Sequence, residues 1–336
     1  MTTAPAADIE TVPHLTPDQV RAVLRLMDEV GDADGTYPLS EHVVLHLRHG
    51  GDTGAKHLLV YAEGSRNDSD DALAGYGHLD VADVVEGASA ELAVHPAHRR
   101  QGYGRALVEA AVAASPDGRL RLWAHGEHDA AAPLAKALGF RRSRVLWQMR
   151  RSLYAPVPAP ELPDGVRLRP FEVGRDEDAW VRVNNRAFAD HPDQGRWTRL
   201  DLEIREAEPW FDPAGFLLAE REDGALLGFH WTKVHGATAG AHVTGTADAT
   251  DATHDHDGVQ AHPHEPIGEV YVLGVDPAAQ GMRLGAALTL AGLRYLRGRG
   301  LSQAMLYVDE SNVRAVALYE RLGFVHWSTD VAFLRN

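Results

Sequence analysis

Residues 92–104 read LAVHPAHRRQGYG, and residues 273–285 read LGVDPAAQGMRLG. Each stretch is a short apolar run, a turn marked by proline, and a set of glycine, basic and amide residues that opens an amphipathic helix. Farther along, each copy has a second helical pattern that ends in Leu-Gly-Phe, at 138–140 and at 322–324. The prolines lie 181 residues apart and the final glycines 184 apart. This spacing predicts a duplicated domain, because solenoid repeats have periods of about 20 to 50 residues.

The composition is that of a globular protein long enough for two domains. The chain has 336 residues, of which 44% are hydrophobic and 24% charged, and it contains no cysteine, which excludes disulfides, thiolate metal ligands and a cysteine nucleophile. No apolar run is long enough to span a membrane, and the N-terminus lacks the features of a secretory signal, so we expect a cytoplasmic protein. The net charge of -15 disfavours binding to nucleic acid or an anionic membrane. We expect a monomer that acts on a small cationic or neutral molecule.

Two segments interrupt the repeated pattern of strands and helices. Residues 154–164 are rich in proline, which predicts an extended linker between a domain at 1–153 and a domain at 165–336. Residues 236–266 are mostly small or polar and predict a flexible surface insertion in the second domain. The histidines of this insertion include His254, His256, His262 and His264. They do not predict a metal site, because no helix or strand would fix their geometry.

The glycine-rich turn of each copy is a candidate anion site. Backbone N–H groups at the start of a helix have no acceptor within the helix, and the helix dipole adds to their attraction for a diphosphate. Neither the P-loop pattern nor an intact Gly-x-Gly-x-x-Gly is present, so the nucleotide classes that use them are not supported.

At these turns the chain resembles the GNAT acetyltransferase superfamily, whose acetyl-CoA site has the pattern Arg/Gln-x-x-Gly-x-Gly/Ala. Residues 99–104 match this pattern, and residues 280–285 depart from it with Arg283 at the middle glycine. Either a helical φ lets the Arg283 side chain point outward, which we favour, or its guanidinium contacts a phosphate of CoA. The resemblance implies an α/β (α+β) fold of two tandem GNAT domains. Each would have a mixed, mostly antiparallel central sheet flanked by helices.

Other segments are similar to the mycothiol synthase family, and with the turns they cover most of the chain. These segments are residues 123–126, 146–153, 186–195, 210–216 and 268–271. The resemblance implies acetyl transfer from acetyl-CoA to the cysteinyl amine of 1D-myo-inositol 2-(L-cysteinylamino)-2-deoxy-α-D-glucopyranoside, the last step of mycothiol biosynthesis in actinobacteria. Two alternatives keep the fold: an N-acetyltransferase for another amine, such as an aminoglycoside or a peptide, and a non-catalytic acyl-CoA sensor.

Counting back from shared landmarks indicates which copy is catalytic. Glu269 lies six residues before Val275, and the first copy has Ala88 six residues before Val94. Tyr319 lies four residues before the glycine of the second Leu-Gly-Phe, and the first copy has Ala135 at the same distance from its own. Acid and base chemistry is therefore expected only in the second copy. Glu269 would take the amine proton, Tyr319 would protonate the CoA thiolate, and backbone N–H groups of 273–275 would stabilise the oxyanion.

The resemblance also implies binding residues. In the second copy those for acetyl-CoA are Leu273, Gly274, Val275, Gln280, Gly281, Met282, Arg283, Leu284, Gly285, Ala286, Asn312, Val313, Arg314, Ala315, Val316 and Ala317. The first copy is expected to bind acetyl-CoA without turnover, through Leu92, Ala93, Val94, Arg100, Gln101, Gly102, Tyr103, Gly104 and Arg105. The implied acceptor residues are Glu41, Asp193, Lys233, Glu269 and Tyr307. Asp193 stands where the family commonly has Glu, so its reach is one methylene shorter. No metal is expected.

Overall fold

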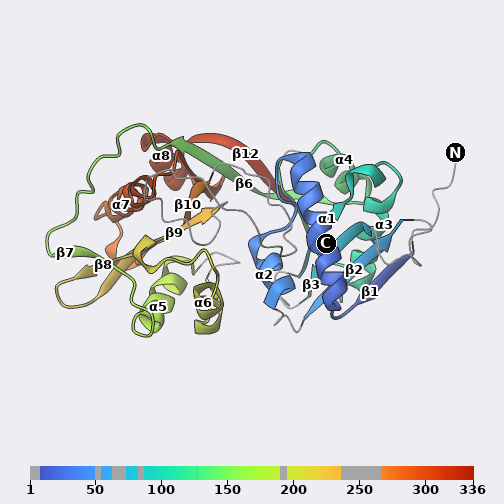
Figure 1. Ribbon diagram of the computed structural model, residues 1–336, viewed down its shortest axis with the longest axis horizontal. Helices are drawn as coiled ribbons and strands as arrows, with labels where there is room; N and C mark the ends of the chain where they lie inside the picture. Colours follow the sequence, from blue (N-terminus) through green and yellow to red (C-terminus); the bar gives the residue numbers. More distant parts are fainter. Residues whose placement is uncertain are drawn as a thin grey trace, which may run out of the picture. The chain divides into compact units, whose positions relative to one another are not determined.

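The computed structural model describes residues 8–49, 54–62, 73–81, 87–126, 128–189, 195–235 and 266–336. They form two compact units (Figure 1). Unit 1 comprises Met1–Trp147, Asp309–Ser311 and Ser328–Asn336, and unit 2 comprises Gln148–Val308 and Asn312–Trp327. Three separate stretches of the chain thus contribute to unit 1.

Unit 1 is built on a sheet with the strand order β1-β2-β3-β4-β5-β12. Its strands are β1 (Ile9–Val12), β2 (Ala55–Tyr61), β3 (Leu73–Asp80), β4 (Ala88–Val94), β5 (Leu120–Ala124) and the later part of β12 (Val325–Arg335). Its helices are α1 (Pro17–Asp34), α2 (Glu41–His49), α3 (Tyr103–Ala114) and α4 (Ala131–Ala137), with a short turn η2 (Pro96–His98). Helix α1 begins at Pro17, where Thr16 and Gln19 form a reciprocal capping box.

Unit 2 has the corresponding sheet, with the strand order β6-β11-β10-β9-β8-β7. Its strands are β7 (Val166–Pro170), β8 (Phe216–Arg221), β9 (Leu226–His235), β10 (Ile267–Val275), β11 (Gln303–Asp309) and the later part of β6 (Arg141–Ser152). Its helices are α5 (Glu177–Ala187), α6 (Arg199–Glu206), α7 (Leu284–Gly298) and α8 (Val313–Arg321), with short turns η3 (Pro213–Gly215) and η4 (Pro277–Ala279). The β4–β5 and β10–β11 pairs are parallel, while β1–β2–β3–β4, β7–β8–β9–β10 and β5–β12 are antiparallel, so the predicted fold class is confirmed.

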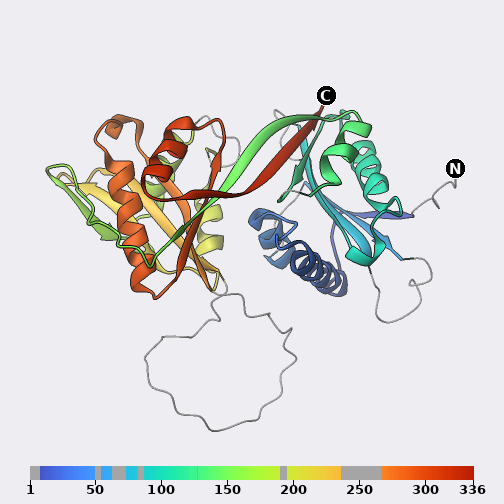
Figure 2. The ribbon, with the colours of Figure 1, turned by 90° about the horizontal axis from the view of Figure 1, so that it is seen from above.

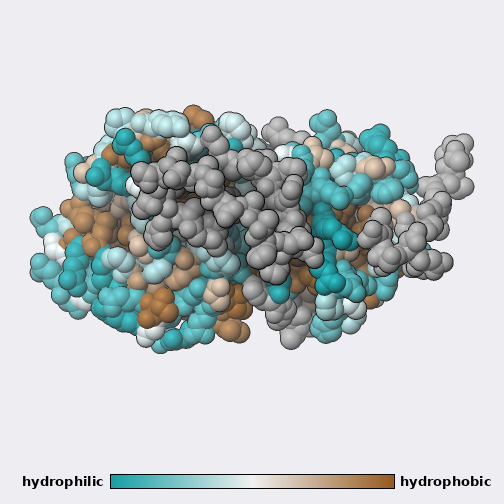
Figure 3. Space-filling view, viewed as in Figure 1, coloured by the Kyte–Doolittle hydropathy of each residue, from teal (hydrophilic) through white to brown (hydrophobic). Residues whose placement is uncertain are grey.

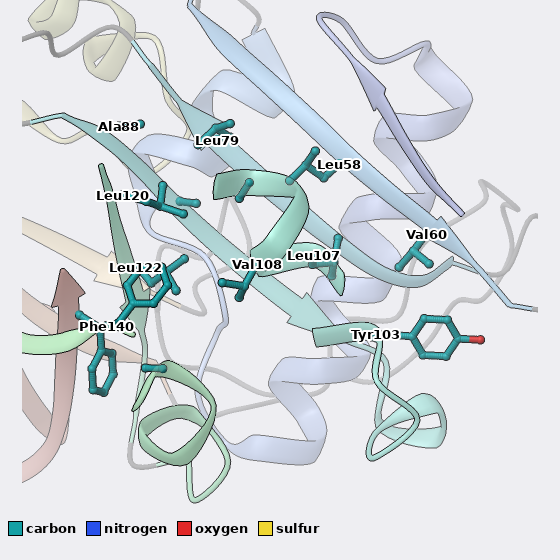
Figure 4. Close-up of a cluster of buried hydrophobic side chains, with 14 of the residues drawn as sticks. Leu58, Val60, Leu79, Ala88, Tyr103, Leu107, Val108, Leu120, Leu122 and Phe140 are labelled. Carbon is teal, nitrogen blue, oxygen red and sulfur yellow. The ribbon is translucent and has the colours of Figure 1, made fainter. Parts of the chain in front are cut away.

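Helices pack on both faces of each sheet. In unit 1, Leu107 and Val108 of α3 face strand residues such as Leu58 and Leu120 (Figure 4). The other face carries α1, whose Met27 is fully buried. In unit 2, α5 covers an aromatic cluster centred on Trp180 and Trp231, and Leu284 and Leu288 of α7 lie in the core on the other face. The described surface seen in Figure 3 is mostly hydrophilic.

Two glycines at corresponding positions let the helix after the glycine-rich turn lie close to its sheet. Gly75 pairs with Val94 and Gly228 pairs with Val275. A Cβ at Gly228 would lie 2.8 Å from the carbonyl oxygen of Gly274 and 3.2 Å from Leu288 of α7. At Gly75 it would lie 3.1 Å from a side chain of α3. In both units the glycine therefore leaves room for a leucine of the helix to approach the sheet closely.

The strands β6 and β12, green and red in Figure 2, each divide between the two units. The packing thus divides the chain between Trp147 and Gln148, within β6, rather than in the proline-rich segment 154–164. That segment packs on unit 2, where Val157 is buried and its carbonyl accepts a hydrogen bond from Arg294 of α7. Residues 331–335 of β12 complete the sheet of unit 1 by pairing with β5. The later part of β12 therefore belongs to unit 1, although its sequence follows the second copy of the repeat.

A buried cluster of charges holds this C-terminal strand in unit 1. Asp330 of β12 accepts hydrogen bonds from the Gly126 N–H at 2.8 Å and from Nδ1 of His125 at 3.0 Å. Nε2 of His125 lies 3.4 Å from Glu91 of β4, which accepts the N–H of Ser40 before α2 at 2.5 Å. Burial alone would lower the pKa of His125, but hydrogen bonds and charge from Asp330 and Glu91 outweigh it and raise the pKa to about 10. The imidazolium thus links β4, β5 and β12.

We expect Asp330→Ala to lower the free energy of unfolding of unit 1 by about 3 kcal/mol, because it removes one partner from a buried ion cluster. Guanidinium unfolding followed by circular dichroism measures the loss. Asp117→Ala, which breaks an exposed ion pair with Arg119, is the control and should cost much less, because solvent screens exposed pairs. Equal losses in the two variants would contradict the assignment. Since the pKa of His125 is raised, its contribution is complete below about pH 6.5, its value in the unfolded chain, and is lost as the pH rises to about 10.

None of the described helices has both the length and the apolar character that crossing a membrane requires.

Candidate active site

The parallel strands β10 and β11 separate partway along their length. Their pairing covers residues 268–270 of β10 and ends at the pair Val270 and Leu306. On its other side β10 stays paired with β9 as far as Val275 and Gly228. The backbone of residues 271–275 therefore has an edge that is no longer paired with β11. Because N–H groups point alternately to the two sides of a strand, this edge includes those of Leu273 and Val275, two of the three residues expected to stabilise the oxyanion.

Unit 1 has the same separation. The β4–β5 pairing ends at Glu91 and Trp123, while β4 stays paired with β3 as far as Val94. The predicted acetyl-CoA residues Leu92, Ala93 and Val94 form this free end of β4. Both copies therefore provide an opened sheet beside the glycine-rich turn.

A β-bulge in β10 corrects the comparison of the two copies. The pairing shifts register between Val270 and Val272, so β10 has one more residue than β4 over this length. Glu269 pairs with Lys233, five residues after Gly228, whereas the residue paired with Asp80, five after Gly75, is Ser89. The prediction that Ala88 is the counterpart of Glu269 was wrong by one residue, because sequence counting cannot detect the bulge. Unit 1 still lacks a carboxylate at this position.

Each glycine-rich turn has two residues with a left-handed backbone, at the same two positions. In unit 1 they are Arg100, with φ of 64°, and Gly102, with φ of 95°. In unit 2 they are Gly281, with φ of 86°, and Arg283, with φ of 58°. Glycine and arginine have thus exchanged places between the copies. The expected helical φ at Arg283 was wrong: the residue lies just before α7 in the left-handed region, where a side chain costs roughly 1 kcal/mol, and its side chain is exposed.

In both units three elements meet beside the glycine-rich turn. They are β10, α7 and α8 in unit 2, and β4, α3 and α4 in unit 1. A Cβ at Gly285 would lie 3.8 Å from Leu318 of α8 and 4.0 Å from Val275. At Gly104 of unit 1 it would lie 3.6 Å from Leu134 and from Val94. The first turn of α7 therefore lies against both β10 and α8. Asn312 caps α8 by accepting the N–H of Ala315 at 3.1 Å, so the predicted residues 312–317 form the start of this helix.

Glu269 is a buried and ionised carboxylate. Its side chain is 9% exposed, and its Oε2 lies 2.7 Å from Nε2 of His235. Burial would raise the pKa of Glu269, but the hydrogen bond and charge of His235 and the charge of Lys233 outweigh it and lower the pKa. The carboxylate is therefore charged at neutral pH and can accept a proton.

Lys233 and an aromatic wall lie next to Glu269. The Lys233 ammonium is 4.4 Å from the ring centre of Trp210 and 5.4 Å from that of Tyr271, the residue at the bulge. The Tyr271 hydroxyl accepts a hydrogen bond from Nε of Arg205 at 2.8 Å. Arg205 is 7% exposed and its guanidinium lies 4.0 Å from the ring centre of Trp197. The sequence analysis missed His235 and Arg205, and only the adjacency of His235 to Lys233 in the strand pattern could have indicated the former.

Tyr319 lies in α8, one residue after Leu318, and is 8% exposed. Burial raises the pKa of its phenol to about 12, so the hydroxyl is protonated at neutral pH. Its ring packs against Phe324 of the Leu-Gly-Phe motif with ring centres 5.8 Å apart. The position next to Leu318 puts Tyr319 in the helix that lies against the start of α7.

Tyr307 lies on β11, the strand next to the one that carries Glu269. It lies two residues after Met305, the parallel partner of Glu269, so both should project from one face of the sheet. Its hydroxyl accepts a hydrogen bond from Nε2 of Gln148 at 2.7 Å, and Oε1 of Gln148 accepts one from Arg150 at 2.9 Å. Tyr307 is 43% exposed, so its side chain is accessible to a small molecule that arrives from solvent.

The remaining predicted residues are placed as follows. Glu41 is the first residue of α2 in unit 1, and residues 103–105 open α3. Asp193 and the histidines of the 236–266 segment lie outside the described residues. Within the described ranges, no group of three or more metal-ligating side chains is arranged to hold a metal ion.

Comparisons with known proteins show the family and the fold. Residues 180–324 match the acetyltransferase (GNAT) family and residues 55–142 match a GNAT acetyltransferase domain. A mycothiol acetyltransferase of Acidothermus cellulolyticus is 55% identical over 100% of this chain and 97% of its own length, and one of Streptosporangium roseum is 50% identical over 97% and 99%. Among solved structures, a tandem GNAT protein from the clavulanic acid biosynthesis pathway has a TM-score of 0.67 at 20% identity and covers 98% of both chains, which supports the fold.

We expect Arg283→Gly to raise the free energy of unfolding by up to about 1 kcal/mol, because it relieves a left-handed side chain, and to weaken acetyl-CoA binding about tenfold, because it removes a cation from the turn. Thermal unfolding and isothermal titration calorimetry measure the two effects. Arg283→Lys is the matched control, which keeps the charge and the strain. Unchanged affinity in the glycine variant would mean that the guanidinium only points outward.

Proposed function

The chain belongs to the mycothiol acetyltransferase family of GNAT proteins, and we propose from this that it transfers the acetyl group of acetyl-CoA to the cysteinyl amine of 1D-myo-inositol 2-(L-cysteinylamino)-2-deoxy-α-D-glucopyranoside. The observation that carries the mechanism is the ionised, buried Glu269 next to the opened edge of β10. This reaction would complete mycothiol biosynthesis.

The residues around the turn of unit 2 fit acetyl-CoA. The start of α7 presents N–H groups that have no acceptor within the helix, and Gly281 and Arg283 bend the preceding chain around them. The edge of β10 at 271–275 offers further backbone groups to an extended, amide-containing chain such as pantetheine. Acetyl-CoA supplies the activated acetyl group, and residues 273–275, 280–286 and 312–317 are the proposed contacts.

Glu269 acts as the base. A cysteinyl α-amine has a pKa of about 8, so a carboxylate can remove its proton, directly or through a water, as the N–C bond forms. The charge of Glu269 is kept by His235 and Lys233 despite its burial. N–H groups of 273–275 would stabilise the oxyanion, since the separation of β11 frees this edge.

Tyr319 acts as the acid. Its phenol holds its proton at neutral pH because burial raises the pKa to about 12, and its helix lies against the start of α7. Donating that proton to the departing sulfur would prevent release of a thiolate. Lys233 and Tyr307 are the proposed acceptor contacts in unit 2, with Glu41 and Asp193 added from the resemblance.

Unit 1 is proposed to bind acetyl-CoA without turnover. The sheet separation and the turn are both present, and the proposed contacts are residues 92–94 and 100–105. Its position equivalent to Glu269 holds Ser89, and the buried Glu91 is engaged with His125 and Ser40. The domain at the N-terminal end then has a structural role.

We expect Glu269→Gln and Tyr319→Phe each to lower turnover by about 10²- to 10⁴-fold while acetyl-CoA still binds, because each removes one acid-base group. Loss of thioester absorbance measures the rate, since the acceptor's own thiol would interfere with detection of free CoA. The acetylated product is identified by mass spectrometry.

The acceptor panel tests the substrate. The cysteinyl pseudo-disaccharide, an aminoglycoside and a lysine peptide are compared at equal concentration, and only the first should be acetylated rapidly. Preference for another amine would contradict the proposed acceptor, and failure of all three to stimulate thioester loss would favour the sensor alternative.

We expect titration calorimetry to give two acetyl-CoA sites per chain, and Gly102→Val to leave one, because valine is strained at the left-handed position before α3. Gly118→Val is the matched control, since Gly118 is also left-handed, with φ of 74°, but lies in the loop after α3, which ends at Ala114. A single site in the unmodified protein would contradict binding by unit 1.

A further inference from the structure

Each catalytic cycle leaves a proton on a buried group. If Glu269 accepts the amine proton, it becomes a neutral carboxylic acid whose side chain is only 9% exposed. The next cycle needs the carboxylate again, so this proton has to reach the solvent. Lys233 is a cation beside Glu269 and cannot accept it.

His235 lies where it can carry this proton from Glu269 to the solvent. It is the last residue of β9, two residues after Lys233, and its Nε2 lies 2.7 Å from Oε2 of Glu269. Its side chain is 35% exposed, about four times the fraction of its partner. The ring therefore touches the buried carboxylate with one nitrogen and reaches toward solvent with the rest. Imidazole is also the side chain whose protonation changes most readily near neutral pH.

His125 in unit 1 also contacts carboxylates, and it provides a structural arrangement with which His235 can be compared. There the imidazole lies between two carboxylates, Glu91 and Asp330, and all three side chains are 9–13% exposed. It joins three strands and has little access to water. His235 differs, because it is hydrogen-bonded to the single carboxylate Glu269 and its ring is partly open to solvent.

We propose that His235 is a positioning residue that holds Glu269 in its ionised, correctly oriented state and relays the substrate proton from Glu269 to water. The proposal rests on the proposed function and adds to it the route by which the base is regenerated. No sequence pattern assigned His235 a role.

The proton balance closes without another reactant. The N–C bond forms and the C–S bond breaks, Glu269 gains the amine proton, and Tyr319 gives its proton to sulfur. His235 accepts this proton at Nε2 when its ring is neutral and carries its hydrogen on Nδ1. The imidazolium that results pairs with the restored Glu269 carboxylate, and loss of the Nδ1 proton to water followed by exchange of the ring protons with water returns the ring to the accepting tautomer. Tyr319 regains a proton from water, so CoA thiol and amide are the only products.

The test compares His235→Ala and His235→Asn with the unmodified full-length protein. Asparagine can still donate a hydrogen bond to Glu269 but cannot carry a proton. We expect both variants to lose at least about tenfold in kcat, with KM for both substrates changed less than about twofold, since proton transfer is affected and binding is not. Free imidazole should restore kcat of His235→Ala in a saturable manner and should have no effect on Glu269→Gln.

His95→Asn is the matched control. His95 also pairs with a carboxylate, with Nε2 2.6 Å from Glu29, but in unit 1, and asparagine can replace its capping bond to the Ala97 N–H. This variant should keep full activity. Circular dichroism and acetyl-CoA affinity show whether each variant is folded.

Two results would overturn the inference: full kcat in His235→Asn, or a slow His235→Ala that imidazole does not restore. Either requires that the unmodified protein acetylates the cysteinyl pseudo-disaccharide. If it does not, the proposed function fails first, and the two failures are thus distinguishable.

Discussion

The early end of the parallel pairing between β10 and β11 is the constraint on which the rest of the site depends. Continued pairing beyond Val270 would use the backbone groups of 271–275 in the sheet, and no edge would remain for an extended ligand. The separation also lets α7 begin against the strand end and α8 pack beside it, as the contacts around Gly285 show. Glu269, within the last paired residues, is held rigidly where the opening starts. The chemistry therefore follows from backbone geometry, onto which a few side chains are added.

Much of this was predictable from the sequence, because glycine, proline and apolar spacing carry backbone information directly. The duplicated turns and the helices that follow them lie where local patterns predict. Counting from the landmarks shared by the two copies indicated Glu269 and Tyr319. Glu269 lies on β10 beside the opening, and Tyr319 lies in the helix that packs near it.

What could not be predicted depends on pairing between distant strands. The bulge between Val270 and Val272 changes which residues of the two copies correspond, and it is visible only in the register with β9. The same is true of His235, which meets Glu269 because β9 and β10 are neighbours while 34 positions separate them in sequence. The left-handed φ of Arg283 was missed because arginine rarely adopts it.

The two turns show how a duplicated module can diverge without losing its shape. Both keep two residues with a left-handed backbone. Glycine avoids the strain at the first of these positions in unit 2, as Gly281, and at the second in unit 1, as Gly102. Each copy thus retains one strained arginine at a different place. Since the fold tolerates strain of roughly 1 kcal/mol at either position, the ancestral turn needed its conformation more than it needed a particular residue.

The place of β12 affects the order in which the protein can be assembled. Unit 1 contains most of the earlier residues, yet β5 gains its antiparallel neighbour only from residues 331–335. During synthesis the ribosome therefore makes all of unit 2 before the last strand of unit 1 exists. Until then the edge of β5 is unpaired on the side where β12 will bind, and His125 lacks its hydrogen bond to Asp330. Unit 1, most of which is translated first, is therefore completed last.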